Sequence, residues 1–102
     1  MDVKLHHRLN EEEIWIHENH APDVRLALKG KILATERSPY QTMVVGETRT
    51  LGRFFTLNDF LQLTEADEFI YHEMIVHPAL AVNPRIRRVL IIGGGDGGTA
   101  RE

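Results

Sequence analysis

The sequence predicts an α+β N-terminal region, made of a small antiparallel β-domain and a linking helix, followed by the start of an α/β domain with a parallel sheet. Short apolar stretches separated by turn residues occupy positions 14–63, as in antiparallel sheets. An amphipathic segment of about three helical turns comes next. Finally, the four aliphatic residues Val89–Ile92 lead directly into a glycine-rich turn. Such a run is typical of a strand covered on both faces.

The expected domain boundaries follow changes in this pattern. Residues 1–12 are polar and have no periodicity, so we expect a mobile leader. The remaining parts are an antiparallel β-domain at 13–64, a linking helix and connection at 65–84, and the first strand, glycine loop and helix start of the α/β domain at 85–102. Because a parallel strand needs a neighbour reached through a crossover, we interpret the chain as the N-terminal part of a longer protein.

The β-domain is expected to contain about six short strands. Ile14–Ile16 begin the first, and alternation of apolar and polar residues at 24–29 predicts the second. Gly30 interrupts this alternation, which then continues toward a turn at Ser38-Pro39. Turn residues separate the later strands, which we expect at 41–45, 48–50, 53–57 and 60–63.

A helix is expected to start at Thr64. The spacing Thr64-x-x-Asp67 resembles a capping box, and the carboxylates of the first turn are favoured by the helix dipole. Pro78 marks the end of the helix or a kink in it. His72 and His77 are five residues apart and therefore about 140° apart around the axis, whereas the zinc-protease motif needs a spacing of four. We expect no metal site.

The glycine turn predicts a site for a nucleotide-like ligand. Five of the six residues from Gly93 to Gly98 are glycine, so a ligand can lie against bare backbone, and a helix is expected from about Thr99. The carboxylate of Asp96 would repel a pyrophosphate but attract a cation. The loop therefore favours a nucleoside that carries positive charge, with a tight turn that binds nothing as the alternative.

Composition argues against several classes of protein. The net charge is −3 with scattered lysines and arginines, which does not indicate nucleic-acid binding. There is no cysteine, so disulfides and thiolate zinc sites are excluded. No apolar run is long enough to span a bilayer, and the N-terminus has no signal-peptide core. We expect a cytoplasmic protein without membrane contact.

From Trp15 onward the chain resembles the polyamine aminopropyltransferases, the family that includes the spermidine synthases. The two longest matching motifs are Thr64–Met74 and Val89–Gly98. Shorter matches are Trp15-Ile16-His17-Glu18, Ser38-Pro39-Tyr40-Gln41 and Leu57 to Gln62. One departure is Leu57-Asn58-Asp59, where the family usually has Leu-Asp-Gly. Asn or Asp must therefore supply the positive φ of that hairpin turn.

The resemblance implies a Rossmann-like, methyltransferase-type second domain and an enzyme that transfers an aminopropyl group from decarboxylated S-adenosylmethionine to putrescine. The products would be spermidine and 5′-methylthioadenosine. The donor is a co-substrate, and no metal or other cofactor is implied. In the family, an aspartate beyond Glu102 accepts the proton of the attacking amine. The resemblance also implies that the β-domain at 13–64 is an oligomerisation domain and that the protein is a homodimer or homotetramer.

The resemblance further assigns site residues by position. Residues that would bind the donor nucleoside or methylthioadenosine are Gln41, Gly93, Gly94, Gly95 and Gly97. Residues that would bind the polyamine or the aminopropyl arm are His72, Asp96, Tyr71 and Gln62, with Tyr71 also a candidate to orient the attacking amine. Asp96 would meet the ammonium of the aminopropyl arm, in agreement with the charge argument above.

Three other functions are considered. A methyltransferase usually has an acidic residue two positions before the first glycine, where this chain has Ile91, and a small residue in place of Asp96. A nicotinamide dehydrogenase needs an acidic residue about twenty positions after the turn. The chain could also be an oligomerisation module without catalytic activity. We expect the 102 residues alone to be inactive, and the sequence leaves open whether the acceptor is putrescine, a longer polyamine or agmatine.

Overall fold

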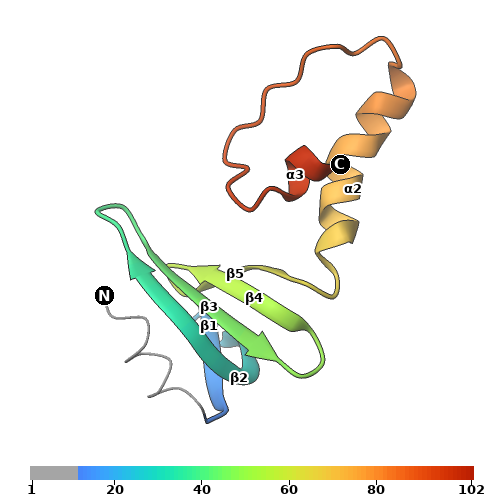
Figure 1. Ribbon diagram of the computed structural model, residues 1–102. Coiled ribbons are helices and arrows are strands. Elements are labelled where there is room, and N and C mark those ends of the chain that lie inside the picture. The colour runs from blue at the N-terminus through green and yellow to red at the C-terminus, as the bar shows by residue number, and fades with distance from the viewer. Residues whose placement is uncertain (1–11) are drawn as a thin grey trace. The chain divides into compact units, whose positions relative to one another are not determined.

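The computed structural model describes residues 12–102 and divides into two compact units. The first unit ends at Ala66, and the second spans Asp67–Glu102. Residues 1–11 of the expected leader lie outside the described residues. Figure 1 shows the strands of the first unit and the two helices of the second.

The first unit is a five-stranded antiparallel sheet in which each strand pairs with the next (Figure 1). The antiparallel β-domain expected from the sequence is therefore confirmed. Its strands are β1 (Ile14–Ala21), β2 (Val24–Arg37), β3 (Thr42–Thr48), β4 (Gly52–Leu57) and β5 (Phe60–Thr64).

The expected separate strand at 48–50 is wrong. Thr48 is the last residue of β3, and its hydroxyl oxygen accepts a hydrogen bond of 2.9 Å from the backbone N–H of Leu51. This short side-chain contact stabilises a turn between β3 and β4, since threonine hydroxyls compete with strand ladders for nearby backbone groups. Thr48 and Thr50 are β-branched, which favours a strand, but the pairing of β3 with β4 ends at Thr48.

The expected break at Gly30 is also wrong, because β2 continues through it. Gly30 pairs with Ile14 of β1, while the next residue, Lys31, pairs with Glu47 of β3. The strand thus changes partners at the glycine. A Cβ atom at this position would collide with the backbone carbonyl of Glu47. The missing side chain allows the close approach of two backbones and does not end the strand.

The core of the first unit is centred on Phe54, which is 2% exposed. Phe54 lies opposite Gly46 in the β3–β4 register and opposite Thr64 in the β4–β5 register. The buried carboxylate of Glu18 accepts a hydrogen bond of 3.3 Å from the backbone N–H of Leu61, which links β1 to β5. The sheet therefore curls enough to bring its first and last strands together.

The hairpin between β4 and β5 confirms the expected use of positive φ by Asn58 and Asp59. Their φ angles are 49° and 68°, values that asparagine and aspartate tolerate better than other side chains. Asn58 also accepts a hydrogen bond of 3.0 Å from the N–H of Thr42 and donates its own N–H to the Thr42 carbonyl at 2.9 Å. The turn is thereby tied to the start of β3.

The second unit contains the linking helix, α2 (Glu68–Val82), which begins later than expected. Thr64 belongs to β5, and the N-cap residue Asp67 makes no side-chain capping hydrogen bond, so the predicted capping box does not form. The helix also continues past Pro78. Proline at this position removes a single backbone N–H from the ladder, and neighbouring turns hold the helix on both sides.

Residues 89–92, the expected first strand of the α/β domain, are not in a strand in this unit. A parallel strand forms only beside a hydrogen-bonded neighbour, and none lies beside this segment among residues 12–102. The expected helix after the glycine loop is confirmed as α3 (Gly98–Arg101). Neither helix in the described part of the chain combines the length and apolarity that crossing a bilayer requires.

Candidate functional site

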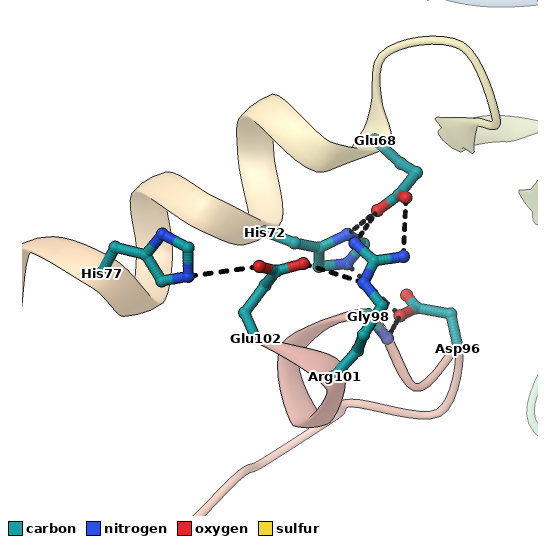
Figure 2. Close-up of polar contacts among 7 residues, drawn as sticks. All are labelled: Glu68, His72, His77, Asp96, Gly98, Arg101 and Glu102. Atoms are coloured by element: carbon teal, nitrogen blue, oxygen red, sulfur yellow. Dashed lines mark hydrogen bonds and ion pairs between the residues drawn. The ribbon is translucent and has the colours of Figure 1, made fainter. Parts of the chain in front are cut away.

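A network of polar contacts joins α2 to α3 and to the glycine loop (Figure 2). At its centre is His72, whose side chain is 2% exposed. Its Nδ1 contacts the carboxylate of Glu68, which lies one helical turn earlier on α2. Its Nε2 lies 3.3 Å from Oδ1 of Asp96 in the glycine loop. The imidazole is thus held between two carboxylates.

Arg101 binds the same Glu68 carboxylate from α3 (Figure 2). Its two terminal nitrogens donate to the two oxygens of Glu68 at 2.8 and 2.9 Å, in the bidentate geometry that makes such pairs strong. Hydrogen bonds from Arg101 and then from His72 lower the pKa of Glu68 to about 2. The same pairing raises the pKa of Arg101. Glu68 is therefore a firmly ionised carboxylate.

Asp96 occupies the position where the glycine loop becomes a helix. Its Oδ1 accepts a hydrogen bond of 2.7 Å from the N–H of Gly98, the first residue of α3. Gly98 in turn packs against His72, and a Cβ atom there would collide with the imidazole. The Asp96 side chain is still 26% exposed. Its carboxylate is therefore oriented by the protein and accessible to a cationic ligand.

A second acidic group lies at the end of α3. Nε2 of His77 is 3.1 Å from Oε1 of Glu102, and the other oxygen of Glu102 accepts a hydrogen bond of 2.8 Å from Arg101. Side-chain donor atoms of Glu73, His77 and Glu102 lie within 4.8 Å of one another. Among residues 12–102 this is the group whose spacing could suit a metal ion. His77 and Glu102 also contact each other, and Glu102 binds Arg101. The expectation of no metal site stays a prediction.

The second unit also contains a cleft of about 660 Å³. Tyr71 contributes to its wall and is 62% exposed, with its ring in edge-to-face contact with His72 at 5.1 Å between centroids. Apolar residues of α2 and of the segment before the glycine loop form most of the remaining wall. The cleft therefore combines an apolar surface with a few polar groups, as small-molecule sites usually do.

The structure brings together five of the residues that the sequence suggested. The cleft is lined by Tyr71, His72, Gly93, Gly94 and Asp96. Gly95 and Gly97 belong to the same loop, and Gly97 has a φ of 80°, which requires glycine in practice. Gln41 and Gln62 belong to the first unit. The binding roles of all these residues stay predictions.

Sequence reasoning missed Glu68 and Arg101 as site residues. For Glu68 a signal existed, because a carboxylate and a histidine four residues apart lie on the same helix face. From its place in the first helical turn, Glu68 is expected only to interact favourably with the helix dipole. Arg101 carried no comparable signal, since it is 33 residues from its partner in the chain.

Two family models match the chain, and together they cover most of it. Residues 14–65 match the spermidine synthase tetramerisation domain, and residues 68–102 match the spermine/spermidine synthase domain. The boundary between the two matches falls at the same place as the boundary between the two structural units.

Curated relatives and solved structures agree with these matches. The polyamine aminopropyltransferases of Clostridium acetobutylicum and Alkaliphilus metalliredigens are 50% and 53% identical over 91 residues, which are 88% of this chain and 32% of theirs. Spermidine synthase from Thermotoga maritima superposes with a TM-score of 0.83 at 37% identity, over 90% of this chain and 33% of that one. A spermidine synthase in complex with the transition-state analogue AdoDATO gives the same TM-score and identity.

The chain spans about a third of the length of the curated relatives it matches. The match nevertheless includes both the β-domain and the residues around the glycine loop. This chain belongs to the spermidine synthase family of polyamine aminopropyltransferases.

Proposed function

We propose that the complete protein transfers an aminopropyl group from decarboxylated S-adenosylmethionine to putrescine, giving spermidine and 5′-methylthioadenosine. The observation that carries this proposal is the placement of Asp96. Its carboxylate follows a glycine turn, is oriented by the N–H of Gly98, and lies beside His72 at the cleft. A spermidine synthase of known structure that is 37% identical to this chain binds the transition-state analogue AdoDATO, which supports a small-molecule site.

The chemistry requires little beyond positioning and proton removal. A neutral amine of putrescine attacks the carbon bonded to the donor sulfur, the C–S bond breaks, and its electron pair goes to sulfur to leave a neutral thioether. The new secondary ammonium then loses a proton to a general base. Because the sulfonium is already a good leaving group, we propose that no metal or other cofactor takes part. Holding the two reactants in line supplies most of the acceleration.

Asp96 would distinguish the decarboxylated donor from the intact one. The aminopropyl arm of the decarboxylated donor ends in an ammonium, which a carboxylate attracts. Intact S-adenosylmethionine also carries a carboxylate at that end, and Asp96 would repel it. This charge selection favours aminopropyl transfer over methyl transfer, which remains the second candidate because both donors are sulfonium nucleosides that suit a glycine loop.

We further propose that the protein is a homotetramer located in the cytoplasm. The tetramer is supported by the match of residues 14–65 to a domain named for tetramerisation in its family. The cytoplasmic location is supported by the lack of cysteine in the sequence, which fits a reducing compartment. The acceptor and the donor are small molecules, and the scattered basic residues give no reason to invoke nucleic acid.

The test uses the complete polypeptide that carries this sequence. It is incubated with putrescine and, in parallel, with decarboxylated or intact S-adenosylmethionine, and the products are identified by mass spectrometry. We expect spermidine and methylthioadenosine from the decarboxylated donor alone. Methylated putrescine from the intact donor would instead establish a methyltransferase, and absence of product from either donor would contradict both enzymatic functions.

A further inference from the structure

We propose that Glu68, anchored by Arg101, is a positioning residue that sets the orientation and proton arrangement of His72 and, through His72, the carboxylate of Asp96. This inference rests on the proposed function for its kinetic consequence. Its structural content is independent of that function. The contacts that carry it run from α3 through α2 to the glycine loop (Figure 2).

The first contact immobilises the Glu68 carboxylate. The guanidinium of Arg101 binds both of its oxygens, and Nε of Arg101 is held by Glu102. Glu102 also pairs with His77 on α2. A planar guanidinium fixes both the position and the plane of a carboxylate, which a lysine ammonium cannot do. Glu68 is thus a rigid acceptor although it belongs to the first turn of a helix.

The second contact gives this acceptor control of His72. The buried ring has Glu68 at Nδ1 and Asp96 at Nε2, and it packs against Gly98 and the ring of Tyr71. Donation to a carboxylate requires a proton on the nitrogen concerned. We infer that Glu68 favours the form of His72 that carries a proton on Nδ1. A proton on Nε2 would be donated to Asp96. Turning the ring over would lose both contacts.

The third contact connects His72 to the ligand site. Asp96 is oriented on one side by the N–H of Gly98 and on the other by Nε2 of His72. These two partners define where its partly exposed carboxylate can receive the ammonium of an aminopropyl arm. Partners that orient a binding residue without touching the ligand commonly change affinity or activity about tenfold or more when removed. We expect removal of the Glu68 carboxylate to have an effect of this size.

Glu68→Gln in the complete polypeptide is the direct test. Glutamine replaces one acceptor oxygen by an NH₂ donor, which would face a donor of either Arg101 or His72. We expect the KM for decarboxylated S-adenosylmethionine to rise about tenfold, with a much smaller change in the KM for putrescine. Glu47→Gln makes the same chemical change at an exposed side chain of β3 in the first unit and is the matched control. We expect it to behave as the wild type.

A spectroscopic measurement reports the positioning directly. In protein labelled with ¹⁵N-histidine, the ring nitrogens of His72 are identified by their loss in His72→Gln. We expect the Nδ1 signal of His72 to move toward that of an unprotonated nitrogen in Glu68→Gln and to stay in place in Glu47→Gln. A general loss of structure would alter the signals of the other histidines as well.

Three results decide the matter. If the donor KM and the Nδ1 signal are the same in Glu68→Gln and Glu47→Gln, the positioning role is overturned. If Glu68→Gln does not fold, Arg101→Lys keeps the charge but loses the bidentate contact, and an unchanged Nδ1 signal there likewise overturns the proposal. If the wild type transfers no aminopropyl group, the proposed function fails, and the Nδ1 signal still supports or contradicts the role of Glu68.

Discussion

Glu68 shows how much a single side chain can gain from partners that are distant in sequence. It lies in the first turn of α2, where the helix dipole already favours a carboxylate. The larger effects come from Arg101 and His72, whose hydrogen bonds lower its pKa. Since Arg101 is on α3, the ion pair also holds the two helices of the second unit together. The same contact therefore contributes to stability and to the order of the site.

The depressed pKa of Glu68 predicts an acid-dependent loss of stability. The folded-state pKa of about 2 is below the ordinary value of 4.5, so the folded state binds this proton less readily than the unfolded chain does. The stabilisation is fully present above about pH 4.5 and is lost as the pH falls toward 2. The stability difference between wild type and Glu68→Gln should therefore shrink over this interval, as measured by denaturant unfolding at a series of pH values.

Arg101→Met provides the control for this prediction. Arg101 is the largest cause of the low pKa of Glu68, so its removal should make the effect of Glu68→Gln on stability less dependent on pH. If that effect kept the same acid dependence in the Arg101→Met background, the attribution to this ion pair would be wrong. The two single changes and the double change form a mutant cycle that isolates the pair.

At the scale of secondary-structure elements, glycines explain how β2, β3 and β4 fit together. Gly30 lets β2 pass from one partner strand to another, and Gly46 accommodates the ring of Phe54 on the neighbouring strand. A Cβ atom on Gly46 would lie 2.5 Å from Cζ of Phe54 and 2.7 Å from its Cε1. The close packing of β3 on β4 therefore depends on an absent side chain as much as on the aromatic ring.

Gly46→Ala is expected to destabilise the first unit by about 1–3 kcal/mol, the usual range for overpacking a well-packed core. The ring of Phe54 is 2% exposed, and Phe54 pairs with Gly46 in the β3–β4 register, so the ring has little room to move away from an added methyl group. Amide hydrogen exchange of β3 and β4 measures this local loss. Combining the change with Phe54→Leu, which shortens the facing side chain, should recover part of it. If the destabilisation of the double variant equals the sum of the two single destabilisations, the proposed clash is contradicted.

At the scale of the whole molecule, the first unit has a small core and a large apolar surface. Among the described residues of this unit, the one buried hydrophobic side chain is that of Phe54. Several other large apolar side chains are about half exposed, namely Trp15, Val24, Leu26 and Phe60. Burial of such surface against other copies of the chain would add apolar contacts that the isolated sheet lacks. This distribution supports the oligomeric state proposed from the family match.

We expect the complete polypeptide to have the molar mass of a tetramer, because the first unit supplies apolar surface and matches a tetramerisation domain. Light scattering coupled to size-exclusion chromatography measures this mass directly. Tyr71→Ala changes an exposed side chain of the second unit and should leave the mass unchanged. A monomer at micromolar concentration would contradict the prediction. A stable dimer would also contradict the tetramer and would favour the homodimer, the other assembly that the family resemblance implies.

From the sequence alone, the antiparallel β-domain, the helix after it and the helix after the glycine turn could be predicted, whereas the strands expected at 48–50 and 89–92 do not form. Alternation and turn residues predicted the antiparallel domain, and the glycine turn predicted the start of α3, because both patterns depend on contacts between residues near in sequence. The family resemblance pointed to Tyr71, His72 and Asp96, and the structure places all three at one cleft. Their roles in binding stay predictions.

Which residues hold the site in place depends on contacts that form only when the chain folds. The availability of hydrogen-bonding neighbours decides three features that local patterns mispredicted. These are the continuation of β2 through Gly30, the place of Thr64 in a strand, and the absence of a strand at Val89–Ile92. The anchoring of Glu68 by Arg101 depends on the packing of α3 against α2. Local sequence patterns carry no information about pairs brought together by folding, since the energy of such a pair arises only when both side chains share one site.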